Sequence, residues 1–86
     1  MMHTYDSVLQ HITSYLHNKL EGSLEVHANS HFTKDLNVDS IQVFEIIEEL
    51  EETYAIVIPL ELLYKQQIQT VSDLVEEILR LVEKKR

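Results

Sequence analysis

The chain has 86 residues, of which 44% are hydrophobic, and its mean hydropathy of −0.14 is that of a globular protein rather than a disordered tail. It has no cysteine, which excludes disulfides, thiol catalysis and cysteine-based zinc or iron–sulfur centres. We therefore expect one domain over residues 1–86, built around a modest apolar core.

The charge balance is strongly acidic, with 15 acidic against 7 basic residues and a net charge of −8 when histidine is neutral. Nucleic-acid binders carry a basic surface, and the basic run here is only Lys84 to Arg86. We therefore expect partners with basic surfaces and no nucleic acid. No apolar run approaches the roughly 20 residues that span a membrane, and the first residues do not resemble a secretory signal. The expected location is cytoplasmic, and the expected state is a monomer.

Helical spacing of the apolar residues dominates the rest of the pattern. One glycine and one proline leave little room for β-hairpins. A first helix is predicted over 5–20, ending before Gly22, and a last helix over 71–84, beginning at Thr70 with Asp73 three positions on. A short helical turn is predicted over 60–65, after Pro59. With the central helix described below, these elements predict an all-α, up-and-down-like bundle of four helices.

The connector between the first two predicted helices, residues 21–38, is longer than most loops in a compact domain. Four apolar residues within it are spaced so that they can anchor it to the core: Leu24, Val26, Phe32 and Leu36. We therefore interpret it as an ordered loop.

The central segment, residues 40–54, is a strong helix former without glycine or proline. Asp39 is suited to be its N-cap, with Gln42 at the capping-box position, so Ser40 becomes the first helical residue. At about 100° per residue one side of this helix is apolar and is expected to face the core: Val43, Ile46, Ile47, Leu50 and Tyr54.

The opposite side of the central helix is acidic, formed by Glu45, Glu48, Glu49 and Glu52 with Glu51 at its border. Ile41 projects into this face, and Phe44 lies at its edge. A solvated face that keeps the protein soluble is one interpretation. The other is a docking surface with an apolar centre and a charged rim. The sequence alone leaves both open.

The segment Asp35-Leu36-Asn37-Val38-Asp39-Ser40-Ile41, followed by the acidic helix and Ile58-Pro59, resembles the acyl carrier proteins. The match runs without a gap from Phe32 to Pro59, and the flanking helices agree in placement. Three positions depart from the common pattern of housekeeping fatty-acid carriers, since Ile41 stands for leucine, Asn37 for glycine and Gln42 for aspartate.

This resemblance implies that Ser40 carries 4′-phosphopantetheine, attached from coenzyme A by a phosphopantetheinyl transferase, with Asp39 as part of the motif. It implies a carrier, not an enzyme, that holds acyl groups as thioesters for fatty-acid or polyketide-type biosynthesis. Its partners would be acyl-loading and acyl-processing enzymes whose basic surfaces dock on the acidic face. Two alternatives remain: an aminoacyl or D-alanyl carrier, and an unmodified helical adaptor.

The resemblance also implies that short acyl chains lie between the helices, where an aliphatic lining is available: Val43, Ile47, Leu50, Ile58, Leu62 and Ile68. Each of these residues, taken singly, is better explained as plain core.

Metal and catalytic interpretations fit the sequence poorly. Asp35-x-Asn37-x-Asp39 opens like a calcium-binding loop, but Ser40 stands where glycine is required and Ile46 where glutamate is required. The five histidines (3, 11, 17, 27 and 31) suggest no ligand set, and we expect them at the surface. Ser40 has no G-x-S-x-G elbow around it. We therefore expect neither a metal site nor catalysis.

Overall fold

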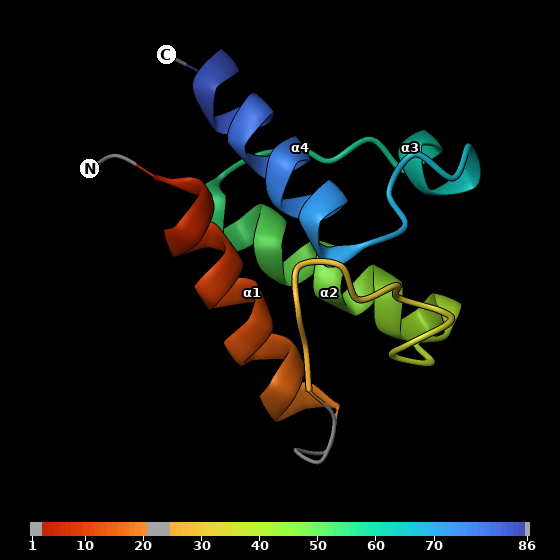
Figure 1. Cartoon of the computed structure of the whole chain (residues 1–86). Coiled ribbons are helices and arrows are strands. Elements are labelled where there is room, and N and C mark those ends of the chain that lie inside the picture. The colour runs from red at the N-terminus through yellow and green to blue at the C-terminus, as the bar shows by residue number, and fades with distance from the viewer. Residues whose placement is uncertain (1–2, 21–24, 86) are drawn as a thin grey trace.

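A computed structural model describes residues 3–20 and 25–85 (Figure 1). Within these residues every named element of secondary structure is a helix. The helices are α1 (Tyr5–Lys19), α2 (Ser40–Tyr54), α3 (Glu61–Tyr64) and α4 (Val71–Lys84). The predicted all-α architecture is confirmed, and the observed bounds differ from the predicted ones by one residue at most. Gly22, the predicted stop of the first helix, lies outside the described residues. None of the described helices is long and apolar enough to cross a membrane.

The first and last helices begin at capping boxes, which fixes where each starts. The Thr4 hydroxyl accepts the Ser7 N–H at 3.1 Å, and the Ser7 hydroxyl oxygen accepts the Thr4 N–H at 3.0 Å. At α4 the Thr70 hydroxyl accepts the Asp73 N–H at 3.1 Å, while the Asp73 carboxylate accepts the Thr70 N–H at 3.0 Å. Both boxes satisfy backbone donors that a helix start otherwise leaves free.

Helices α1 and α4 lie side by side, and α2 crosses behind them in the view of Figure 1. Tyr5 and Ser72 join the two outer helices through a 2.6 Å hydrogen bond between their hydroxyl groups. The apolar stripes of all three long helices meet in a core that the loops complete; its buried members are Val8, Ile12, Leu16, Leu20, Phe32, Leu36, Val38, Ile46, Ile47, Leu50, Tyr54, Ile56, Ile58, Ile68, Val71, Leu74, Val75 and Ile78.

The described part of the long connector is ordered, as predicted, because it pairs with the segment leading into α4. The Phe32 N–H donates to the Gln69 carbonyl at 2.9 Å, and the Val71 N–H donates to the Ser30 carbonyl at 3.0 Å. Phe32 and the other predicted anchor Leu36 are buried, and Val26 is half-buried. Leu24 lies outside the described residues.

The C-terminal end of α2 is closed by contacts from distant residues. Ala55 adopts a left-handed conformation there, with φ 53°. The Lys85 ammonium donates to the Ala55 carbonyl at 2.7 Å and to the Tyr54 carbonyl at 3.3 Å, placing a cation at the negative end of the helix dipole. Glu51 accepts the Ile58 N–H at 2.8 Å and so holds the connector to α3. These bonds fix α2 at the end opposite to Ser40.

Candidate functional site

The start of α2 is set by a complete capping box. Asp39 is extended (φ −88°, ψ 177°), and its carboxylate accepts the Gln42 N–H at 2.8 Å. In return the Gln42 side-chain oxygen accepts the Asp39 N–H at 3.1 Å. Asp39 is therefore the N-cap, as its position predicts, and Ser40 is the first residue of the helix.

The turn that leads into α2 is held equally firmly. Asn37 has φ 54°, a left-handed conformation that glycine and asparagine adopt more readily than other residues. Val38 is buried, and its N–H donates to the Phe32 carbonyl at 2.9 Å. This conformation explains physically why asparagine can stand where the acyl carrier proteins that the sequence resembles commonly have glycine, and Ser40 follows three residues later at the surface.

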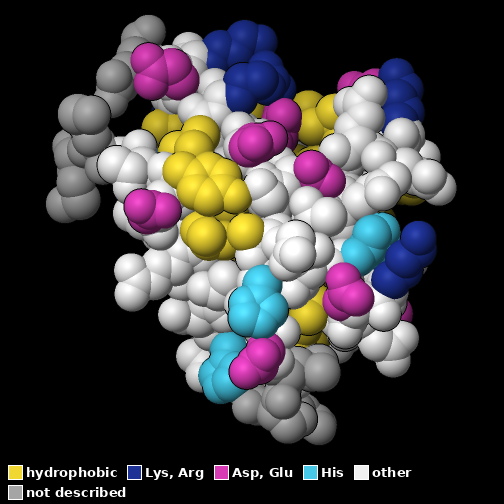
Figure 2. Space-filling view, viewed as in Figure 1, with side chains coloured by type: hydrophobic (Ala, Val, Ile, Leu, Met, Phe, Trp, Pro, Cys, Tyr) yellow, Lys and Arg dark blue, Asp and Glu magenta, His cyan; other side chains and the backbone are white. Residues whose placement is uncertain are grey.

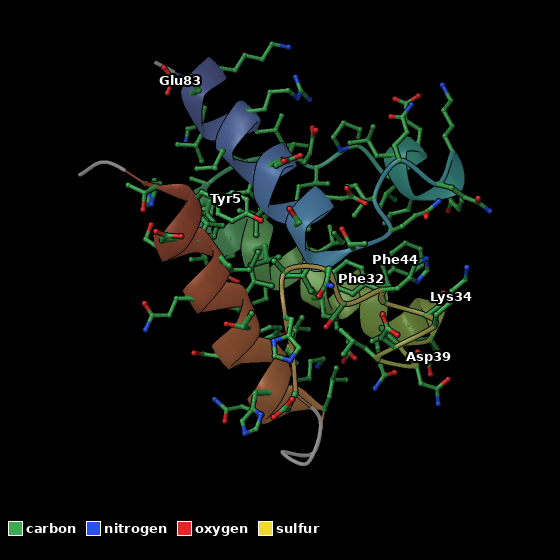
Figure 3. All side chains as sticks on the ribbon, viewed as in Figure 1. Tyr5, Phe32, Lys34, Asp39, Phe44 and Glu83 are labelled. Carbon is green, nitrogen blue, oxygen red and sulfur yellow. The ribbon has the colours of Figure 1, made fainter. Side chains whose placement is uncertain are left out.

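The side chain of Ser40 is exposed, and its hydroxyl makes no hydrogen bond with any residue that the structure describes. Beside it a groove of about 660 Å³ opens between α2, α3 and the connector. Figure 3 shows Phe32, Lys34, Asp39 and Phe44 around the N-terminal half of α2. The floor of the groove is apolar and is formed by Phe32, Val38, Val43, Phe44, Ile46, Ile47, Leu63, Ile68 and Leu74.

The groove contains only part of the predicted lining. Of the six residues expected there, three line the groove: Val43, Ile47 and Ile68. The other three belong to the core instead, with Leu50 and Ile58 fully buried and Leu62 half-buried against them. The groove opens beside the first turns of α2, whereas Leu50 lies farther along the helix. For the same reason Val43, expected as core, is only half-buried.

Lys34, on the rim of the groove, was not singled out from the sequence, and His31 beside it was considered there only as one of five surface histidines. The ring nitrogen Nδ1 of His31 accepts the N–H groups of Thr33 and Lys34, each at 3.2 Å. No local pattern signals this arrangement, because the groove forms only when the connector folds against α2 and α3.

The apolar residues of the predicted docking surface are exposed to solvent. Ile41 is 72% exposed on the first turn of α2. Phe44 is 38% exposed and also lines the groove, so it contributes to both surfaces. Three further apolar side chains are exposed on and before α3, and the sequence did not single them out: Val57, Leu60 and Tyr64.

The four glutamates of the predicted docking surface differ in their surroundings. Glu48 and Glu52 are exposed and form no ion pair within the described residues. Glu45 forms an ion pair with Lys19 of α1, with 3.4 Å between the charged atoms. Glu49 is half-buried and accepts the Thr53 hydroxyl at 3.0 Å. Glu48 and Glu52 are therefore the members whose charge is not shared with a neighbouring group.

Two carboxylates of the calcium-like segment, Asp35 and Asp39, form hydrogen bonds with backbone groups of the protein. Asp35 accepts the His31 N–H at 2.7 Å, and Asp39 caps α2. Across the described residues no three histidine, aspartate or glutamate side chains gather as metal ligands. His27 contacts Glu25 at 3.3 Å instead.

Comparison with known proteins identifies the family. Residues 8–78 match the family model described as "Phosphopantetheine attachment site". A protein named as a probable acyl carrier protein in Caulobacter vibrioides is 46% identical over 52 residues, which cover 60% of this chain and 58% of that protein. An acyl carrier protein of Helicobacter hepaticus is 44% identical over 54 residues, covering 63% of this chain and 68% of the relative. The match thus spans a little over half the length of the first relative.

A small helical bundle with a serine exposed at a capped helix start is the architecture of a phosphopantetheine-bearing carrier. With a family model that covers most of its length, the chain belongs to the acyl carrier protein family. Membership implies a covalently bound 4′-phosphopantetheine. The residues present fit this group, because Ser40 offers an exposed hydroxyl without a hydrogen-bond partner among the described residues, next to a groove with an apolar floor.

Proposed function

We propose that Ser40 is the attachment site and that the protein carries acyl intermediates of fatty-acid or polyketide-type biosynthesis. The observation that carries this proposal is the position of Ser40, exposed at the first turn of α2 and beside the groove. When bound, phosphopantetheine supplies a terminal thiol that holds an acyl group as a thioester. Asp39 and Gln42 fix the helix start that presents the hydroxyl, and the groove offers an acyl chain shelter from water.

The apolar floor of the groove favours an acyl cargo over an aminoacyl one. An aliphatic chain gains free energy when it leaves water for such a surface, at about 25 cal/mol per Å². A charged ammonium group would lose its hydration there. Loading assays with acyl and aminoacyl ligases, run side by side on the modified protein, distinguish the two cargoes.

The proposed partners are a phosphopantetheinyl transferase and acyl-handling enzymes with basic docking surfaces, acting on a carrier that is not itself a catalyst. Support comes from the exposed Ile41, which lies on the same side of α2 as the unpaired carboxylates of Glu48 and Glu52. A cytoplasmic location stays a prediction.

The test is intact-mass spectrometry after incubation with coenzyme A and a broad phosphopantetheinyl transferase. The wild type should gain the mass of one phosphopantetheine. Ser40→Ala should gain none while keeping its helical circular-dichroism spectrum, because Asp39 remains as the cap. Ser14→Ala, which removes another exposed helical serine, is the matched control and should be modified in full. Full modification of Ser40→Ala would reject the assigned site, and an unmodified wild type would favour the adaptor.

A further inference from the structure

Although the protein as a whole is acidic, one lysine without an ion pair among the described residues lines the groove. Most described cations already have a partner: Lys19 pairs with Glu45, Lys65 with Glu61 and Arg80 with Glu77, while Lys85 caps α2. Two lysines, Lys34 and Lys84, form no ion pair within the described residues. Lys84 ends α4, whereas Lys34 lines the same groove as Ser40.

Lys34 is held at the rim of this groove by a well-bonded turn. Its N–H donates to His31 Nδ1 at 3.2 Å, and the same nitrogen accepts the Thr33 hydroxyl at 3.1 Å. The Asp35 N–H closes the turn on the His31 carbonyl at 3.0 Å, and the Asp35 carboxylate accepts the His31 N–H. The backbone that carries the Lys34 side chain is thus fixed, while its ammonium is free of both Asp35 and Asp39. Figure 3 shows Lys34 and Asp39 at the same end of α2, and Figure 2 shows a basic side chain there beside a histidine.

A phosphodiester on Ser40 would add a negative charge next to the Asp39 carboxylate. The capping box already uses the N–H groups of Asp39 and Gln42, and no basic residue lies in the first turn of α2. Two neighbouring anions repel each other, and a cation that approaches both of them offsets part of this repulsion. Of the described residues that line the groove, Lys34 is the one with a permanently charged cationic side chain.

We propose that the Lys34 ammonium binds the phosphodiester that joins the arm to Ser40. This inference rests on the proposed attachment at Ser40 and adds a binding residue to it. A charge-assisted contact at this point compensates the repulsion from Asp39. It also holds the first atoms of the arm at the mouth of the groove, so that the far end is directed along the apolar floor rather than into solvent.

The first experiment uses the modified wild-type protein, after intact mass has established that it carries the arm. Its lysines are labelled by reductive ¹³C-methylation, which keeps their charge, and the NMR spectrum is compared with that of unmodified protein. The Lys34 signal should shift when the arm is attached, and added salt should reverse part of the shift because salt screens the contact. The Lys84 signal should stay in place. A Lys34 signal that does not respond to the arm would overturn the inference.

The second experiment follows the phosphodiester itself by ³¹P NMR in proteins modified to completion. Lys34→Gln should move the resonance and remove most of its salt dependence, Lys34→Arg should restore both, and Lys84→Gln is the matched control that should leave both unchanged. Equal resonances in wild type and Lys34→Gln would reject the contact while the attachment at Ser40 still stands. If the wild type gains no mass at all, the proposed function fails, and this inference fails with it.

Discussion

Replacement of Asp39 by alanine tests the local structure on which the site depends. The substitution removes the 2.8 Å bond between the Asp39 carboxylate and the Gln42 N–H but keeps the Asp39 N–H, so the reciprocal bond at 3.1 Å can persist. Half of the box is lost. N-cap losses of this kind cost about 0.5–2 kcal/mol, and we expect about 1 kcal/mol here. In a domain of this size, 1 kcal/mol corresponds to a fall in Tm of roughly 4–8 °C.

The assay is thermal unfolding followed by circular dichroism, with Asp39→Asn as the control. Asparagine caps helices about as well as aspartate, so it should recover most of the lost Tm without restoring the charge. Modification rates of the two variants then separate the roles of the cap and the charge. If Asp39→Asn is stable but slow to be modified, the carboxylate itself matters to the transferase. A Tm that Asp39→Ala leaves unchanged would refute the capping argument.

Three further predictions concern other parts of the molecule. Ala55→Gly should raise Tm by a few degrees, because φ 53° costs alanine roughly 1 kcal/mol that glycine does not incur, less the entropy glycine loses on folding; an unchanged or lower Tm would contradict this. Burial alone would raise the pKa of Asp73, but hydrogen bonds from the Gln69 N–H and from Thr70, together with the nearby His31, lower it overall, so its ionised form favours the folded state. Its contribution is therefore present above about pH 4, the usual aspartate range, and is lost as the pH falls through the lowered folded value. The Tm deficit of Asp73→Asn should accordingly shrink in acid, and a constant deficit would count against the argument. The double variant Glu48→Lys/Glu52→Lys should slow modification strongly at low salt and less at high salt, whereas Ile41→Ala should slow it at both; a charge-reversed protein modified at the wild-type rate at low salt would return this face to a solubilising role.

The helix starts could be read from the sequence because each depends on residues close together in the chain. Thr70 with Asp73, and Asp39 with Gln42, are spaced as capping boxes require, and the structure forms both. The same local logic applies to the exposure of Ile41, which follows from helical spacing alone. Capping boxes and helix faces depend on residues that are three or four positions apart, so a single sequence is enough to predict them.

The lining of the groove could not be read in this way. Periodicity shows which side of α2 is apolar, but it does not show which neighbour each apolar residue meets. Leu50 and Val43 share that side, yet Leu50 is buried in the core whereas Val43 borders the groove. The contact of Lys85 with the end of α2 spans about thirty residues of sequence and has no local signal either. These outcomes depend on how the helices cross.

The two ends of α2 show how the fold divides stability from function. At the C-terminal end the Lys85 ammonium binds the Tyr54 and Ala55 carbonyls, and the Glu51 side chain holds the next connector through the Ile58 N–H. At the N-terminal end the capping box fixes the helix start but leaves the Ser40 side chain exposed, and the groove beside it is open to solvent. The proposed attachment at Ser40 would need this asymmetry, because the hydroxyl must be accessible to the transferase while the helix that presents it keeps its place. The test is to measure, for the Asp39 and Glu48/Glu52 variants described above, both the modification rate across a salt series and the Tm. A variant that changes the rate but not the Tm would show that access to Ser40 and stability of α2 are separable.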